Sequence, residues 1–187
     1  MRKPRADGER NRERLMEAAK AGFADAGPNV SLEEVARRAG VGIGTLYRHF
    51  PTRDALIEAV YRRELEGFAE AGDQLAATLP PGKALHAWMH LLVDYIATKK
   101  VIATAVATMV SDSADLYASS GTRITDTLRA MIVRAAEAGD IRPDVDPDDL
   151  LRALVGFSYG SDSPGWEASA KRLIDILMDG LRPPPAH

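Results

Sequence analysis

The sequence predicts an all-α protein in which an N-terminal head, residues 1–52, continues into a larger helical body, residues 53–187. Apolar residues recur every three or four positions along most of the chain, which is the period of an amphipathic helix. No segment shows the period-two alternation of a β-strand, and no internal repeat is visible. The helix expected after residue 52 keeps one apolar seam from Leu56 to Phe68, so no linker is expected between head and body.

The first predicted helix covers residues 9–26. Leu15, Ala19 and Phe23 fall on one face of it, and the segment over residues 27–29 ends it with Gly and Pro. Basic residues are concentrated before this helix and in its first turns: Arg2, Lys3, Arg5, Arg10, Arg12 and Arg14. A basic arm suits contact with phosphate, and a disordered solubilising tail is the alternative explanation of this composition.

Residues 30–56 predict two short helices separated by a tight turn, followed by the start of a third helix. Ser31 and Glu34 have the spacing of a capping box, in which the Ser31 hydroxyl accepts from the Glu34 amide and the Glu34 carboxylate reaches back. Gly40 can end this helix because glycine adopts the left-handed conformation without a steric cost.

The helix after the turn is expected to have one buried and one exposed face. Leu46 and Phe50 are four residues apart and are expected to pack inward. The other positions face outward, and most carry donors suited to phosphate oxygens and base edges: Ile43, Gly44, Thr45, Tyr47, Arg48 and His49. This pattern is typical of a helix-turn-helix recognition element, and a helical hairpin in an unrelated core is the alternative.

The segment V-G-I-G-T-L-Y-R-H-F-P-T-R-D-A-L, residues 41–56, resembles the DNA-binding signature of the TetR family of bacterial transcriptional regulators. The resemblance covers residues from about 9 to 57. It implies a DNA-binding head, an effector-binding and dimerising body, and a homodimer that represses until a small molecule binds. It also implies that Tyr47 and His49 contact the operator backbone and that Arg53 contacts phosphate. Ile43 and Gly42 depart from the family pattern, because many members carry Lys or Ser there.

The complete set of residues expected to contact DNA comes from the outward face, the arm, the helix cap and the resemblance. It consists of Ile43, Gly44, Thr45, Tyr47, Arg48, His49, Arg53, Arg5 and Ser31.

Composition and charge narrow the function further. There is no cysteine, catalytic motif or phosphate-binding loop, and neither a signal peptide nor a membrane-spanning run is visible. We therefore expect a cytoplasmic protein that has no cofactor, no membrane association and no enzymatic activity. The net charge is −3, but the first 68 residues contain 13 Lys and Arg against 11 Asp and Glu, whereas the rest contain 11 against 16. A basic end with an acidic body suits docking of that end on phosphate.

The body is expected to contain six helical segments. They cover residues 53–78, 85–96, 99–110, 124–139, 147–157 and about 166–181, with a loop over residues 111–121. Asp146 followed by Pro147 is typical of a helix N-cap. The first segment belongs to head and body alike, so a tilt of this helix can transmit a signal from a ligand to the recognition helix.

The last two helices are apolar over more than one stripe, and we expect them to form a four-helix bundle with a second copy of the chain. Closure of the chain's own core by the same helices is the alternative. The candidate interface residues are Leu151, Leu154, Phe157, Leu173, Ile174 and Leu177.

The helices between the head and the last two helices supply candidates for binding a largely apolar small-molecule effector: Trp88, Tyr95, Met109, Tyr117 and Met131. An aromatic and Met stripe also occurs in an ordinary core. His86, His90 and Asp94 are spaced by four residues and can share one helix face that offers metal ligands. No further ligand is evident, and a solvated or hydrogen-bonded face explains this spacing, so no metal site is predicted.

The sequence therefore favours a DNA-binding transcriptional regulator, a ligand-responsive repressor that binds an inverted-repeat operator as a homodimer. A dimeric small-molecule-binding or protein-interaction module that no longer reads DNA is the alternative, and the apolar Ile43 and the acidic net charge support it. An enzyme built in the helical cavity around His86 or Asp94 is a more distant alternative.

Overall fold

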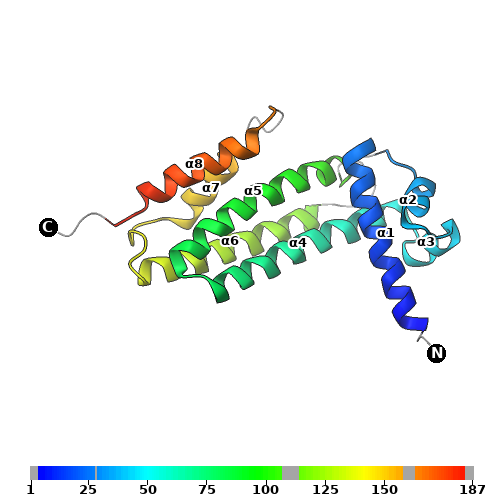
Figure 1. The fold of residues 1–187 in the computed structure, drawn as a ribbon, viewed down its shortest axis with the longest axis horizontal. Helices are drawn as coiled ribbons and strands as arrows, with labels where there is room; N and C mark the ends of the chain where they lie inside the picture. Colours follow the sequence, from blue (N-terminus) through cyan, green and yellow to red (C-terminus); the bar gives the residue numbers. More distant parts are fainter. Residues whose placement is uncertain (1–3, 28, 107–113, 158–162, 184–187) are drawn as a thin grey trace. The chain divides into compact units, whose positions relative to one another are not determined.

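The computed structural model describes residues 4–27, 29–106, 114–157 and 163–183, and within these ranges it contains eight α-helices and no strand (Figure 1). The prediction of an all-α protein is confirmed. No helix in these ranges is both long enough and apolar enough to cross a membrane. The helices are α1 Pro4–Ala26, α2 Leu32–Ala39, α3 Ile43–His49, α4 Arg53–Thr78, α5 Pro81–Val106, α6 Ala114–Glu137, α7 Pro147–Phe157 and α8 Trp166–Gly180.

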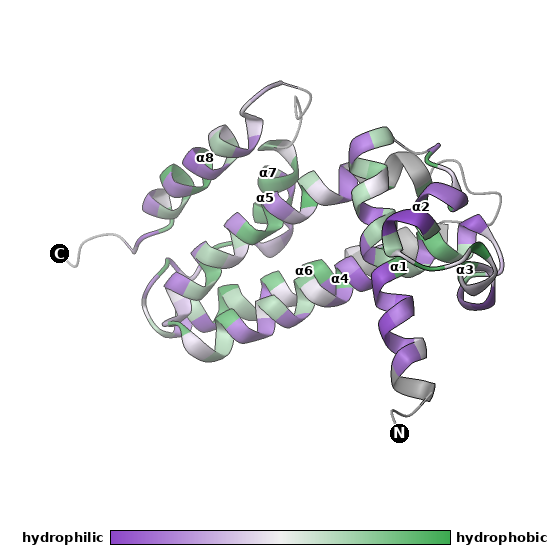
Figure 2. Cartoon of the chain, turned by 45° about the vertical axis from the view of Figure 1, so that its right-hand side comes forward, coloured by the Kyte–Doolittle hydropathy of each residue, from purple (hydrophilic) through white to green (hydrophobic). Residues whose placement is uncertain are grey.

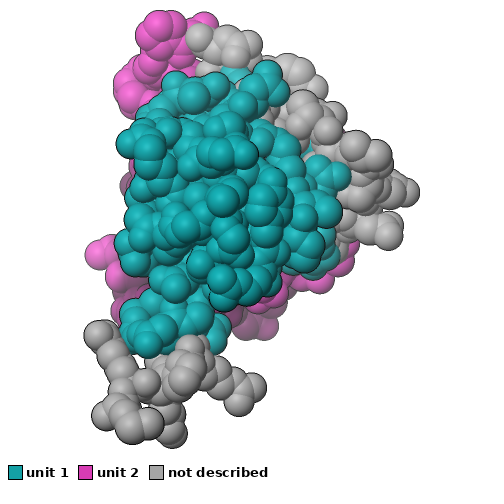
Figure 3. Space-filling view, turned by 90° about the vertical axis from the view of Figure 1, so that its right-hand side faces the viewer, with its two compact units in different colours: residues 1–64, 98–116 teal, residues 65–97, 117–187 magenta. Residues whose placement is uncertain are grey.

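The chain divides into two compact units (Figure 3). Unit 1 contains residues 1–64 and 98–116, and unit 2 contains residues 65–97 and 117–187. The chain passes from one unit to the other inside α4, α5 and α6. Continuous helices therefore connect the two units.

The core of unit 1 is built from α1, α2, α3, the start of α4 and the end of α5. Phe23 of α1, Leu46 of α3 and Leu56 of α4 are buried there, together with Phe50 directly after α3. The inward positions predicted for Leu46 and Phe50 are confirmed. Burial of this face leaves the opposite face of α3 available for contact.

The local signals around α2 act largely as predicted. Ser31 Oγ accepts a hydrogen bond of 3.1 Å from the Glu34 amide, and Gly40 ends the helix with a φ of 64°. The Glu34 carboxylate does not complete the capping box, because it accepts hydrogen bonds from the guanidinium groups of Arg37 and Arg38 instead. Charge-assisted bonds to arginine are stronger than a bond to a backbone amide.

Two further caps are present, and the one at Asp146 is the predicted one. Thr52 Oγ1 accepts from the Ala55 amide at 3.1 Å at the start of α4. Asp146 Oδ1 accepts from the amides of Asp148 and Asp149 at 2.7 and 3.2 Å at the start of α7. Each cap satisfies amides that the first helical turn leaves without an intrahelical partner.

The main differences from the predicted helix boundaries concern α5, α6 and α1. α5 is one helix, whereas the sequence predicts separate helices over residues 85–96 and 99–110; the intervening Ala97 and Thr98 do not break a helix. α6 begins at Ala114, inside the predicted loop over residues 111–121, because the Ser and Gly there are tolerated in a helix interior. α1 begins at Pro4 and not at residue 9, since Pro fits the first helical position.

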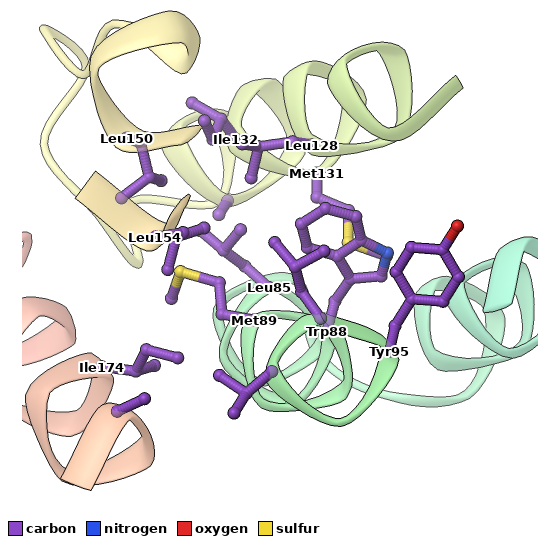
Figure 4. Packing of buried hydrophobic residues seen from close by; sticks show 14 of the residues in the cluster. Leu85, Trp88, Met89, Tyr95, Leu128, Met131, Ile132, Leu150, Leu154 and Ile174 are labelled. Carbon is purple, nitrogen blue, oxygen red and sulfur yellow. The ribbon is translucent and has the colours of Figure 1, made fainter. Parts of the chain in front are cut away.

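The core of unit 2 collects side chains from α4 to α8. The residues labelled in Figure 4 belong to α5, α6, α7 and α8. Trp88 of α5 is fully buried at its centre, and Leu128 and Met131 of α6 pack in the same cluster. The Phe68 ring stacks on the Tyr95 ring with centroids 4.6 Å apart, which joins α4 to α5 within this unit. Leu154 and Ile174 bring α7 and α8 into the same core.

Candidate nucleic-acid interface

The exposed face of α3 carries an aliphatic, a phenolic and a guanidinium side chain. Ile43 is 38% exposed, Tyr47 is 47% exposed, and Arg48 is exposed as well. A Cβ atom added at Gly42 or Gly44 would have no other atom within 4 Å. The backbone at the start of α3 is therefore open to close approach by another surface.

Arg48 and His49 differ in how they are held. Arg48 Nε donates to the carbonyl oxygen of Gly44 one turn earlier at 3.3 Å, a long bond that leaves the guanidinium group exposed. His49 is half-buried, and its Cε1 atom lies 3.9 Å from the position of a Cβ at Gly8. His49 therefore lies where α3 meets α1, and Thr45 is half-buried on α3 as well.

Arg53 is the predicted site residue with the strongest internal contacts. Its Nη1 atom donates to the carbonyl oxygen of Val30 at 2.6 Å, and its guanidinium carbon lies 5.9 Å from the centroid of the Phe23 ring. The side chain is half-buried. Arg53 thus connects the first turn of α4 to α1 and to the segment before α2.

Two other predicted contact residues, Ser31 and Arg5, lie on neighbouring elements. Ser31 is exposed at the start of α2, where its hydroxyl oxygen already serves as the cap. Arg5 lies in the first turn of α1, and its side chain is outside the described part of the structure. The turns of α1 that follow are mostly hydrophilic (Figure 2).

Two arginines of α1 contact the ends of α2 and α3, an arrangement that the sequence analysis missed. The Arg12 guanidinium carbon lies 5.2 Å from the centroid of the Phe50 ring. The Arg14 guanidinium group covers the turn after α2, with Nη2 2.7 Å from the position of a Cβ at Gly40. The sequence spacing of these arginines indicated only a basic surface. A contact such as that of Arg12 with the Phe50 ring joins residues that are distant in sequence, and no local pattern reveals it.

One ion pair, between Arg38 and Asp25, joins α2 to α1 and belongs to a small charged cluster. Arg38 binds Glu34 on its own helix and Asp25 on α1, each at 2.7 Å. Hydrogen bonds from Arg38, and secondarily from Arg37, lower the pKa of the Glu34 carboxyl. The helix that supports the recognition helix is therefore held by charge as well as by its buried apolar face.

The residues predicted to bind an effector lie only partly within the described structure. Trp88, Tyr95 and Met131 are buried together in the core of unit 2 (Figure 4). The indole Nε1 of Trp88 is buried and has no hydrogen-bond partner among the described residues. Met109 lies outside the described residues, and Tyr117 lies in α6 but its side chain is not described.

The residues predicted for the dimer interface divide into three groups by burial. Leu154 and Ile174 are buried in the chain's own core, whereas Leu173 is 41% exposed. Leu151, Phe157 and Leu177 are half-buried. Val155 and Ile176, which are not among the predicted interface residues, are exposed as well, and each lies three or four residues from a predicted position, a spacing that marks a second apolar stripe.

The two histidines of α5 contact a different acidic residue from Asp94, the one that their sequence spacing suggested. His86 and His90 share one helix face, and both contact Asp175 of α8. Asp94 instead lies 2.6 Å from Lys171 Nζ. The spacing identified the histidines, but it cannot reveal a carboxylate that is distant in sequence.

Comparison with known proteins agrees with this helix-turn-helix geometry. Residues 15–60 match the family described as "Bacterial regulatory proteins, tetR family", and residues 80–183 match "Transcriptional regulator SbtR-like, C-terminal domain". The fold and the exposed recognition helix define a helix-turn-helix transcriptional regulator. The chain belongs to the TetR family of bacterial regulators.

Two solved structures are similar over almost the whole chain. A TetR transcriptional regulator from Streptomyces coelicolor is 42% identical with a TM-score of 0.79, and the match covers 92% of this chain and 98% of that chain. A TetR transcription regulatory protein from Mycobacterium vanbaalenii is 34% identical with a TM-score of 0.79, covering 96% and 99%. An HTH-type transcriptional regulator from Staphylococcus aureus is 40% identical over 65 residues, which span 34% of this chain and 35% of that protein. TetR regulators are not enzymes, and the family assignment confirms that prediction for this chain.

Proposed function

We propose that this protein is a ligand-responsive repressor that binds an inverted-repeat DNA operator as a homodimer. In this proposal residues 1–52 read DNA, and residues 53–187 bind the effector and form the dimer. The observation that carries it is the outward face of α3, where Ile43, Tyr47 and Arg48 are exposed beside two open glycines. A solvent-exposed aliphatic group beside two donors is suited to the mixed polar and apolar edges of base pairs.

The proposed DNA contacts follow from the chemistry of this face. The phenol of Tyr47 and the guanidinium group of Arg48 are donors for phosphate oxygens, and Arg48 can also pair with the acceptor edge of guanine. Ile43 replaces the polar residue of many family members, and its side chain suits the methyl group of thymine. The open backbone at Gly42 and Gly44 supports close packing against the sugar-phosphate chain.

The proposed homodimer rests on exposed apolar residues of α7 and α8. Val155, Leu173 and Ile176 are all large and exposed in the single chain. A two-fold axis through such a surface would present two copies of α3, which suits half-sites about 34 Å apart or a multiple of that distance. One short recognition helix alone offers too few base contacts for specific binding.

The proposed effector site lies in the core of unit 2. The buried Nε1 of Trp88 is a donor that an acceptor on a small molecule could satisfy, while Phe68 and Met131 supply an apolar surface around it. To release the DNA, an effector need only bind more tightly to the conformation that does not fit the operator than to the conformation that does. A coupling of about 1–3 kcal/mol changes operator affinity by roughly 5- to 150-fold.

The test is selection of random duplex DNA by the purified full-length protein at moderate salt, followed by sequencing of the enriched duplexes. Enrichment of an inverted repeat is expected, and a Tyr47→Ala, Arg48→Ala double variant should enrich none. A single half-site without its inverted copy would contradict the dimeric assembly. Absence of binding to any duplex by the folded protein would favour the module that no longer reads DNA.

A further inference from the structure

Two imidazoles and one carboxylate converge on the side of unit 2 where α5 meets α8. His86 Nε2 lies 2.7 Å from Asp175 Oδ1, and His90 Nε2 lies 2.9 Å from the same oxygen. The two rings have centroids 4.6 Å apart and planes inclined by 68°. One carboxylate oxygen thus lies within hydrogen-bonding distance of two ring nitrogens from successive turns of one helix.

The packing of both helices fixes this arrangement. Met89, next to His90, and Ile174, next to Asp175, are fully buried in the core of unit 2. One turn further along each helix, Lys171 Nζ binds Asp94 Oδ1 at 2.6 Å. The pairs His90 with Asp175 and Asp94 with Lys171 therefore set the antiparallel register of α5 and α8, so the three side chains converge even without an ion.

The geometry of the three groups suits a transition metal. Their ligand atoms all lie within 4.8 Å of one another. Zinc bonds of about 2.0–2.2 Å to nitrogen and oxygen place tetrahedral ligands about 3.3 Å apart. The Asp175 side chain is about half exposed, so its oxygen is free to move by a few tenths of an ångström. Such a movement would widen the hydrogen-bond distances to the two histidines to the spacing of tetrahedral zinc ligands.

We propose that His86, His90 and Asp175 form a three-ligand site for Zn²⁺ or a similar divalent transition-metal ion. Two neutral imidazoles and a carboxylate are a ligand set that zinc accepts, with water in the fourth position. The ligands are partly exposed, so water reaches them, and His86 and Asp175 also line a surface cleft of about 400 Å³. This site is separate from the proposed DNA-binding residues and does not depend on them.

The ion would act as a cross-link within unit 2. It would join α5, which carries Trp88 in the core, to α8, which carries the exposed apolar surface proposed for dimerisation. A ligand that binds only the folded arrangement stabilises it. Zinc is therefore expected to raise the thermal unfolding midpoint of the full chain.

The direct test uses the full-length protein with any purification tag removed and the metal stripped by chelation. Titration calorimetry with Zn²⁺ is expected to show one ion per chain. The visible absorption of Co²⁺ in the same site should report four-coordinate geometry. His90→Gln and Asp175→Asn are each expected to weaken Zn²⁺ binding at least about tenfold, because a metal ligand is lost.

The matched control is Asp94→Asn. Asp94 lies one turn from His90 on the same helix but binds Lys171, so this variant should keep the wild-type affinity for Zn²⁺. Asp175→Asn is nearly isosteric, and far-ultraviolet circular dichroism would verify that it folds. Unchanged zinc affinity in Asp175→Asn, equal losses in Asp94→Asn and Asp175→Asn, or a stoichiometric ion retained by a His86→Gln, His90→Gln double variant would each overturn the proposal.

Discussion

Arg53 Nη1 donates a hydrogen bond of 2.6 Å to the carbonyl oxygen of Val30, and the same guanidinium group lies beside the ring of Phe23. The family resemblance assigns Arg53 to a DNA phosphate. In the single chain it also ties the start of α4 to α1 and to the segment before α2. Its replacement is therefore expected to change the stability of unit 1 even without DNA.

Arg53→Ala should lower the free energy of unfolding by about 1–3 kcal/mol, because it removes a charged donor from a backbone carbonyl. Denaturant unfolding without DNA measures this change. Arg48→Ala is the matched control, since Arg48 is exposed and bonds only weakly within its own helix; its unfolding free energy should stay within about 0.5 kcal/mol of the wild type. Equal stability of Arg53→Ala and the wild type would contradict a structural role for Arg53.

Tyr47→Phe should weaken binding to the selected operator by about 1 kcal/mol, or roughly fivefold, because one hydroxyl donor is lost. The resemblance implies a backbone contact, so the loss should be equal for operators with altered bases. Affinity measurements on a set of operator variants test this. Tyr47 is 47% exposed, and an unchanged unfolding midpoint would verify that only binding is affected. Unequal losses across the set would instead identify base readout by the phenol.

The elements of the head were predictable because their signals are local. The Ser31 cap and the left-handed Gly40 depend on residues within one turn, and the chain forms them as expected. The failure of the Glu34 carboxylate to complete the capping box could not be predicted in the same way. Arg37 and Arg38 lie on the following turn and compete for its carboxylate with a stronger interaction.

The groupings in unit 2 depend on contacts between residues that are distant in sequence. Helical periodicity places His86 and His90 on one face, but it cannot show that α8 supplies Asp175. Periodicity likewise finds the apolar stripes of α8 without deciding which one faces the chain's own core. Packing buries Ile174 and leaves Ile176 exposed.

Gly82→Ala should destabilise unit 2 by about 1–3 kcal/mol through overpacking. The new Cβ would lie 2.7 Å from Asp140 Cβ, and the Gly82 amide donates to Asp140 Oδ2 at 2.8 Å, so the pair cannot separate without losing this bond. Thermal unfolding measures the effect. Gly67→Ala in α4 is the control: it meets no atom within 4 Å and should stabilise the protein by about 0.5–1 kcal/mol. A neutral Gly82→Ala would show that Asp140 moves freely.

The stability contributed by Glu34 should depend on pH. Hydrogen bonds from Arg38 and Arg37 lower the pKa of its carboxyl in the folded protein below the ordinary value of 4.5. The contribution is therefore present at pH values above 4.5 and is lost as the pH falls through the folded pKa. Urea unfolding of the wild type and Glu34→Gln at a series of pH values should show a difference that shrinks in acid.

Removal of the arginines provides the control for this pH dependence. In an Arg37→Ala, Arg38→Ala background, Glu34→Gln should give a much smaller pH-dependent difference, because the groups that lower the carboxyl pKa are gone. The same pH dependence in both backgrounds would assign it to another group.

Ile176→Lys should convert the proposed dimer to a monomer. Ile176 is 67% exposed on α8, so the single chain should fold with lysine at this position. In a two-fold interface the change introduces an unpaired ammonium group from each copy, and burying such a charge is strongly unfavourable. Sedimentation velocity should show a monomer at concentrations where the wild type is a dimer, and affinity for the inverted repeat should fall with it.

Val133→Lys is the matched control, because Val133 is an aliphatic residue of unit 2 that is 49% exposed on α6 and not on α7 or α8. This variant should sediment as the wild type does and keep its operator affinity. If Ile176→Lys remains a dimer, the exposed stripe of α8 lies outside the interface. If both variants dissociate, the interface extends to α6, and the assignment to α7 and α8 alone is wrong. If only Ile176→Lys dissociates the dimer, the exposed apolar surface of α7 and α8 is the dimer interface, and the dimer that it forms is needed to read the two half-sites of the operator.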